Sequence, residues 1–173
     1  MGTKKTILSE KQLQKRVTEL GAVISRDYVG KKLVLVGVLN GAFIFMADLV
    51  RVISLDDVQV DFIRVSSYGK SSKSSGEITL SKDVELDLTG KHVLLVEDII
   101  DTGRTLAWLV EAFRQKETAS VAICALINKA ERREVDLQPD YTGFDIDEGF
   151  LVGYGLDYAE DFRHLPEVAH LEL

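Results

Sequence analysis

The sequence contains few of the residues that build disulfide frameworks and metal cages. Its 173 residues include one cysteine, Cys124, and three widely separated histidines, His92, His164 and His170. A single cysteine excludes an intramolecular disulfide and a zinc site built from cysteines, and the scattered histidines disfavour a histidine metal site. Cys124 lies inside an apolar run, where we expect a core residue rather than a nucleophile.

The chain also lacks a long apolar run and an excess of positive charge. No stretch approaches the roughly 18 apolar residues that a membrane span requires, and the first residues lack the apolar core of a secretory signal. The formal net charge is −7, whereas proteins that bind nucleic acid non-specifically carry a basic face. We therefore expect a cytoplasmic protein with no membrane and no nucleic-acid partner, and its length suits one domain.

Several runs have the length and composition of β-strands. Continuous apolar runs at 33–39, 92–96 and 121–127 are typical of strands covered on both faces in a parallel sheet. Alternation at 58–63 predicts a strand with one wetter face. Residues 150–154 form a short later strand.

Three segments have the 3.6-residue spacing of helices that pack against a core. Ser9 begins the first with a capping box to Gln12, and its apolar stripe runs to Ile24. The other two cover residues 42–53 and 103–116. Strands that alternate with helices predict an α/β fold with a mostly parallel central sheet flanked by helices. Ligands of such folds bind beyond the carboxyl ends of the strands.

Residues 66–76 interrupt this pattern. The segment holds six serines and two glycines, which offer too little apolar surface to offset the entropy of ordering. Two interpretations stay open: a disordered surface loop, or a mobile lid that orders over a ligand.

The segment 93–105 carries the chemistry of the chain. A buried apolar strand is followed by two adjacent carboxylates, Glu97 and Asp98. After Asp101, a small polar turn at 102–105 opens a helix whose first amides are unpaired and can bind a phosphate. Neighbouring carboxylates one strand-step away suit the hydroxyls of a vicinal diol, or a divalent cation. A phosphate-binding turn next to a diol-binding acid pair suits a ribose 5-phosphate as the ligand.

The same residues also allow a purely structural interpretation. Asp101 alone could be a helix N-cap, and Glu97 and Asp98 could lie on a solvated loop. Two acids directly after a buried strand are costly, however, unless something compensates them. We therefore interpret the segment as a binding site.

Segment 93–105 resembles the binding motif for 5-phosphoribosyl-1-pyrophosphate (PRPP) of the type I phosphoribosyltransferases. From Leu33 to Arg163 the chain is similar to the hypoxanthine-guanine phosphoribosyltransferase branch of that family, in its short bacterial form. The resemblance implies one phosphoribosyltransferase domain over 1–173, with a small hood region and a mobile loop at 66–76. It also implies a magnesium-dependent (Mg²⁺) enzyme of purine salvage that forms a homodimer or homotetramer.

The implied reaction moves the 5-phosphoribosyl group from PRPP to a 6-oxopurine base, hypoxanthine or guanine, with xanthine as a further candidate. The products are a purine nucleoside monophosphate, IMP or GMP, and pyrophosphate. By the resemblance, Asp101 is the catalytic residue that accepts and donates the purine proton. Glu97 and Asp98 contact the ribose hydroxyls and magnesium. The 5′-phosphate and PRPP contacts are Asp101, Thr102, Gly103, Arg104 and Thr105.

Further residues match the purine and pyrophosphate sites of the family. The lysine that donates to the purine 6-oxo group is Lys129, and the other purine-binding positions are Phe150, Leu151 and Asp157. Asp157 also matches an acid near a second magnesium. The pyrophosphate-binding positions are Asn40, Gly41, Ala42 and Arg163, and those of the mobile loop are Ser67 and Tyr68.

Two positions depart from the family pattern. Asn40 stands where a basic residue is usual, so pyrophosphate would be held more by backbone amides and less by charge. Leu151 replaces a more usual valine, which would slightly tighten the base pocket. Neither change removes a reacting group.

Lys129 determines which class of base is expected. An ammonium group only donates hydrogen bonds, and a 6-oxopurine presents an acceptor at the edge where adenine presents a donor. Adenine should therefore be rejected. Two alternatives stay open: a regulatory RNA-binding protein with the same fold, against which the negative net charge counts, and a pyrimidine or adenine phosphoribosyltransferase.

Overall fold

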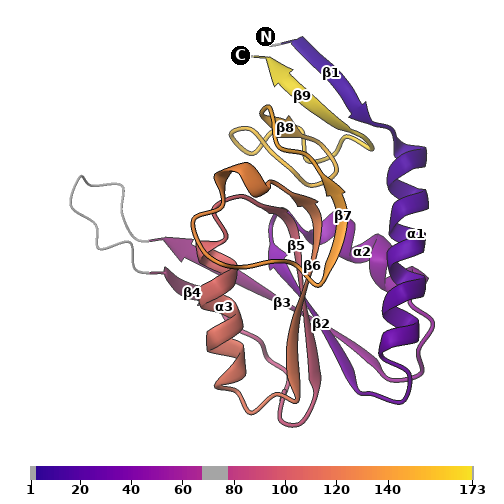
Figure 1. Ribbon diagram of the computed structural model, residues 1–173, viewed down its shortest axis with the longest axis vertical. Coiled ribbons are helices and arrows are strands. Elements are labelled where there is room, and N and C mark those ends of the chain that lie inside the picture. The colour runs from indigo at the N-terminus through magenta and orange to yellow at the C-terminus, as the bar shows by residue number, and fades with distance from the viewer. Residues whose placement is uncertain (1–2, 68–77, 173) are drawn as a thin grey trace.

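The computed structural model describes residues 3–67 and 78–172 (Figure 1). A six-stranded sheet forms its centre, with the strand order β4-β3-β2-β5-β6-β7. All neighbouring strands are parallel except β4, which pairs antiparallel with β3 at one edge. The predicted α/β fold with a mostly parallel sheet is confirmed. Its strands are β2 (Leu33–Leu39), β3 (Val58–Ser67), β4 (Ile78–Lys82), β5 (His92–Ile100), β6 (Ser120–Asn128) and β7 (Tyr141–Asp145).

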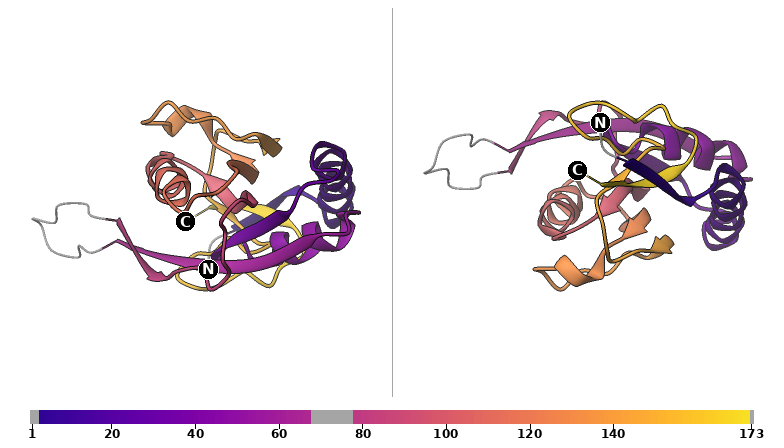
Figure 2. Two further views of the ribbon diagram at one scale, coloured as in Figure 1. Left: turned by 90° about the horizontal axis from the view of Figure 1, so that it is seen from below. Right: turned by 90° about the horizontal axis from the view of Figure 1, so that it is seen from above.

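Helices cover both faces of this sheet (Figures 1 and 2). The apolar faces of α1 (Glu10–Asp27) and α2 (Phe43–Val52) share one core, and α3 (Arg104–Arg114) packs into a second core. Strand β2 contributes side chains to both cores, because alternate residues along a strand face opposite sides of the sheet. Leu33 and Leu35 belong to the first core and Val34 and Val36 to the second. No helix in the described ranges is long and apolar enough to cross a membrane.

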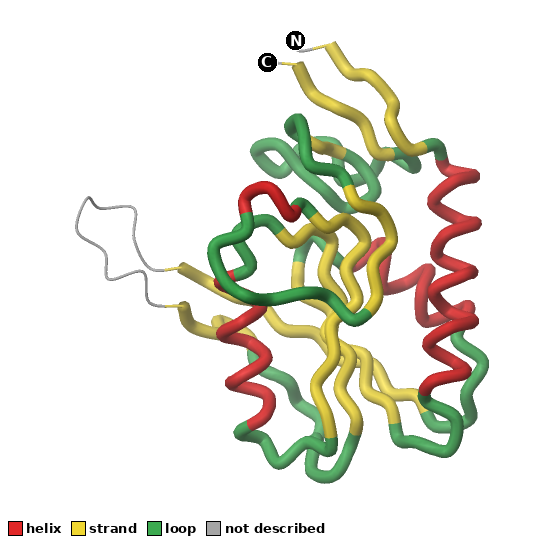
Figure 3. The backbone as a smooth tube through the Cα atoms, in the orientation of Figure 1, coloured by secondary structure: helices red, strands yellow, loops and turns green. Residues whose placement is uncertain are grey.

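A second, three-stranded antiparallel sheet lies beyond the carboxyl ends of the central strands (Figure 1). Its order is β1-β9-β8, so it joins the two ends of the chain. This sheet and the loops around it form the small hood (Figure 3). Its strands are β1 (Thr3–Leu8), β8 (Leu151–Val152) and β9 (Val168–Glu172).

The helix N-terminus at Ser9 and the burial of Cys124 agree with the sequence. The amide of Ser9 donates to Oε1 of Gln12 at 2.9 Å, and the amide of Gln12 donates to Oγ of Ser9 at 3.3 Å. Cys124 is fully buried, and burial raises the pKa of its thiol above the ordinary value. The predicted capping box and the core role of the cysteine are therefore confirmed.

Strand β3 has one wetter face, as predicted, but that face carries the apolar residues Val58, Val60 and Phe62, and the face with Asp61 is the more buried. Val60 is 41% exposed, whereas Asp61 is only 9% exposed. The Asp61 carboxylate accepts hydrogen bonds from the amides of Phe62, Glu85 and Leu86 at 2.7, 2.7 and 3.0 Å. Burial alone would raise the pKa of Asp61, but these amides and the nearby Lys82 lower it. A buried acid thus anchors the chain that follows β4.

Strand boundaries also differ from the apolar runs. Strand β5 continues past residue 96 to Ile100, because Ile99 still pairs with Ile127 of β6. The last predicted strand, 150–154, shortens to β8, because Gly153 and Tyr154 both have positive φ angles, 98° and 52°. Strands β1, β4, β7 and β9 were not predicted. The segment 66–76, expected as a mobile loop and including Tyr68, lies outside the described residues apart from its first two positions.

Candidate active site

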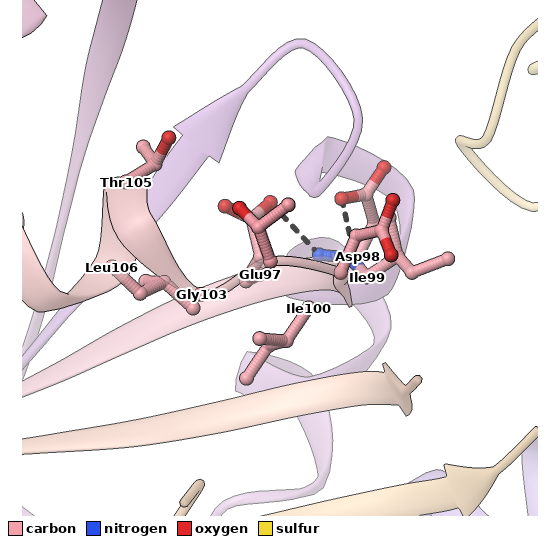
Figure 4. Close-up of a pocket in the computed structure, with 9 residues that line it drawn as sticks. Glu97, Asp98, Ile99, Ile100, Gly103, Thr105 and Leu106 are labelled. Carbon is pink, nitrogen blue, oxygen red and sulfur yellow. Dashed lines mark hydrogen bonds between the residues drawn. The ribbon is translucent and has the colours of Figure 1, made fainter. Parts of the chain in front are cut away.

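A pocket of about 210 Å³ lies where β5 ends and α3 begins (Figure 4). This is the carboxyl edge of the parallel sheet, where ligands of such folds bind. Every residue of the motif from 97 to 105 lines it except Arg104. The pocket residues are Glu97, Asp98, Ile99, Ile100, Asp101, Thr102, Gly103, Thr105 and Leu106.

Glu97 and Asp98 lie within β5, and not after it as expected. The Glu97 carboxylate accepts the amide hydrogen of Asp98 at 3.1 Å, and the Asp98 carboxylate accepts that of Ile99 at 2.7 Å (Figure 4). Burial and the neighbouring Asp98 raise the pKa of Glu97 well above its ordinary value, and burial also raises the pKa of Asp98. Two acids held together in this way favour a cation or hydroxyl donors as their partner.

The loop after β2 lies in close contact with Asp98 of this acid pair. A Cβ atom added at Gly41 would lie 1.9 Å from Oδ2 of Asp98. A Cβ at Gly155, whose φ is +102°, would lie 2.1 Å from the carbonyl oxygen of Gly41. The peptide bond between Leu39 and Asn40 is cis. The structure therefore brings the predicted pyrophosphate loop, the ribose acids and the hood together through glycine contacts.

The turn at 102–105 offers the backbone amides that the sequence predicts. Gly103 has a φ of +81° and makes no side-chain cap for α3. The amide of Arg104 makes a long hydrogen bond of 3.4 Å to Oγ1 of Thr102, and a bound anion could accept from the amides of this turn instead. A Cβ at Gly103 would lie 2.8 Å from Cδ of Arg133, so a larger residue would be strained by the positive φ and would have to displace this side chain. The Arg104 side chain instead pairs with Glu134 at the surface.

Asp101 combines an ion pair with an unpaired oxygen. Its Oδ2 lies 3.0 Å from Nη1 of Arg132, while its Oδ1 is buried without a hydrogen-bond partner among the described residues. Its backbone carbonyl accepts a hydrogen bond from Nε of Arg133 at 3.2 Å. The two arginines belong to a charged turn with no motif of its own, and sequence reasoning missed them.

The candidate purine wall is built from the end of β6 and the start of the hood. The Lys129 side chain is 8% exposed, and its Nζ donates to the carbonyl of Gly149 at 2.9 Å. Phe150 is 46% exposed, and its ring meets that of Tyr158 edge to face, with 5.6 Å between centroids. Leu151 is buried beneath. One exposed aromatic face next to a buried ammonium suits a planar base with an acceptor at its edge.

Arg163 connects the hood acid Asp157 with the loop at Gly155. Its Nη2 lies 3.0 Å from Oδ1 of Asp157, and its Nη1 donates to the carbonyl of Gly155 at 2.7 Å. Its Nε is buried with no partner in the described parts of the chain. Asp157 does not join Glu97 and Asp98, since residues 3–67 and 78–172 contain no cluster of three potential metal ligands.

The comparisons with known proteins agree with this geometry. Residues 3–159 match the family model of the phosphoribosyl transferase domain. The chain is 44% identical over 168 residues to the hypoxanthine-guanine phosphoribosyltransferase of Bacillus subtilis, covering 97% of this chain and 93% of that protein. It is 43% identical over 173 residues to the hypoxanthine phosphoribosyltransferase of Salmonella typhimurium, covering 99% and 97%.

Solved structures show the same likeness. A hypoxanthine phosphoribosyltransferase from Staphylococcus aureus superposes with a TM-score of 0.92 at 40% identity, covering 97% of this chain and 91% of that one. A hypoxanthine-guanine phosphoribosyltransferase from Bacillus anthracis, with HEPES in its active site, has a TM-score of 0.91 at 44% identity, covering 99% of both. The chain therefore belongs to the phosphoribosyl transferase domain family and, within it, to the hypoxanthine-guanine phosphoribosyltransferases.

Proposed function

We propose that the protein transfers the 5-phosphoribosyl group from PRPP to hypoxanthine or guanine, yielding IMP or GMP and pyrophosphate. The observation that carries the proposal is the acid pair Glu97–Asp98. It lies in one pocket with the uncapped start of α3 and in contact with the glycine loop after β2. A phosphate at α3, a diol at the acids and pyrophosphate at the loop reproduce the order of groups in PRPP.

The acids fit a divalent cation as well as a diol. Burial raises the pKa of both carboxyls, and Asp98 raises that of Glu97 further; a bound cation would oppose these shifts. We propose magnesium, because it is held in proteins by one or two carboxylates together with water and substrate oxygens. Such an ion, held by Glu97 and Asp98, would supply positive charge to balance a departing pyrophosphate. Asp157 lies apart from this pair and forms an ion pair with Arg163.

We propose that Asp101 accepts and donates the purine proton. Asp101 lines the pocket, and its buried Oδ1 has no partner among the described residues; an incoming N–H would supply one. The Arg132 guanidinium on Oδ2 would keep the carboxylate oriented. A positioned acid or base of this kind typically contributes about 10²–10⁴-fold to the rate.

Lys129 is proposed to select the 6-oxopurine. Its Nζ already donates to Gly149, which holds the ammonium next to Phe150. A 6-oxo group can accept a second hydrogen bond, whereas the amino group of adenine would leave the buried ammonium facing a donor. Sites that leave a buried polar group unpaired reject the wrong substrate by several orders of magnitude.

An ultraviolet assay with PRPP and magnesium tests the proposal, with hypoxanthine, guanine, xanthine and adenine offered in parallel. We expect nucleotide from the 6-oxopurines alone. Nucleotide from adenine at an equal rate would refute the role of Lys129 and leave the PRPP site standing. No nucleotide from any base, with PRPP still bound, would refute the transferase proposal. Salt-dependent RNA binding would then support the regulatory alternative.

A further inference from the structure

The glycine loop that follows β2 carries no charge of its own. Its residues 40–42 are Asn, Gly and Ala, and Gly41 rests on the Asp98 carboxylate. Pyrophosphate carries several negative charges, and this loop offers no positive side chain to balance them. The cation on the hood side, Arg163, already pairs with Asp157 and Glu160. A second positive group at the loop would therefore add a favourable interaction with pyrophosphate.

Arg64 supplies such a group from the neighbouring strand. In the parallel pairing of β2 with β3, Arg64 lies opposite Leu39, the last residue before the loop. Its Nη2 donates to Oδ1 of Asn40 at 2.6 Å. Arg64 is exposed, and this bond uses one of the five N–H donors of its guanidinium. The remaining donors have the fork geometry that suits phosphate oxygens.

We propose that Arg64 binds the pyrophosphate group of PRPP and that Asn40 orients its guanidinium. The charge that the loop lacks is thus provided by the adjacent strand. Asn40 is the residue that makes this possible, because its amide oxygen accepts from an arginine that a basic residue would repel. This assignment rests on the proposed function and specifies one contact within it.

Isothermal titration with inorganic pyrophosphate and magnesium tests the assignment directly, without turnover. Charge-assisted hydrogen bonds to one guanidinium predict that Arg64→Gln weakens pyrophosphate binding roughly 10- to 100-fold, with a matching rise of KM for PRPP. Binding of IMP, which has the 5′-phosphate and the base but no pyrophosphate, should stay unchanged. Arg114→Gln, at an exposed arginine near the far end of α3, is the matched control and should leave both ligands unaffected.

A charge-restoring double variant separates binding from mere structure. Asn40→Lys combined with Arg64→Gln moves the positive charge onto the loop, and we expect it to regain most of the lost pyrophosphate affinity. Pyrophosphate binding by Arg64→Gln equal to the wild type would overturn the assignment, as would the absence of rescue. If the wild type makes nucleotide while Arg64→Gln binds normally, only the Arg64 assignment fails. A wild type that neither binds pyrophosphate nor makes nucleotide refutes the proposed function as well.

Discussion

Replacing Gly41 by alanine would test how closely the pyrophosphate loop and the ribose acids depend on each other. The new methyl carbon would lie 1.9 Å from Oδ2 of Asp98, and real Cβ atoms essentially never approach closer than 3.0 Å. The two groups must therefore move apart by about 1 Å. Because the loop is also held from the other side by Gly155, we expect the Asp98 carboxylate to rotate away.

Two estimates of the cost agree. Rotation of the carboxylate breaks its 2.7 Å hydrogen bond with the amide of Ile99, and a hydrogen bond to a charged group contributes about 1.5–3 kcal/mol. A misplacement of about 1 Å in an active site costs on the order of 100-fold, which corresponds to about 2.7 kcal/mol. We therefore expect kcat/KM for PRPP to fall about 100-fold, with a parallel loss in PRPP affinity measured by calorimetry in the presence of magnesium.

Two controls decide whether the clash with Asp98 is the cause. Gly90→Ala places a methyl group where nothing lies within 4 Å, at a φ of +68°. It should cost about 1 kcal/mol of stability through backbone strain and leave PRPP affinity unchanged. In an Asp98→Ala background, Gly41→Ala should have little further effect. Fully additive losses in the double variant would refute the reasoning, because they would show that the two residues act independently.

Three further changes have definite expectations. Asp101→Asn should lower turnover by at least about 100-fold with an unchanged melting temperature, and near-normal turnover would contradict its role as a proton carrier. Lys129→Met should reduce the preference for hypoxanthine over adenine, measured as the ratio of kcat/KM values, by at least about tenfold; an unchanged ratio would mean that another group selects the base. Asp61→Asn should cost about 1–3 kcal/mol of unfolding free energy in urea at pH 7. Because the folded pKa of Asp61 is lowered, this loss of unfolding free energy should persist above about pH 5 and shrink as the pH falls below about 4. A loss that does not change with pH would show that the charge of the carboxylate is not its cause.

The buried central strands β2, β5 and β6 and the PRPP motif could be predicted because their patterns are local. A strand buried on both faces needs an unbroken apolar run, as at 33–39. The start of the first helix is indicated by the capping box that Ser9 forms with Gln12, three residues later. Two of the hood strands, β1 and β9, carry no such pattern. Strand β1 is largely exposed and polar, and β9 is five residues long. They form strands because they pair with each other, although they lie near opposite ends of the sequence.

The sequence by itself determined the fold class, the buried central strands and the motif at 97–105, since each depends on residues close together in the chain. Only the tertiary structure decided which distant groups meet there. Arg64 reaches Asn40 because two parallel strands end side by side, and Arg132 reaches Asp101 across the turn after β6. Long-range contacts follow from strand register and close packing, which no local pattern encodes, and these contacts place the charges of the site.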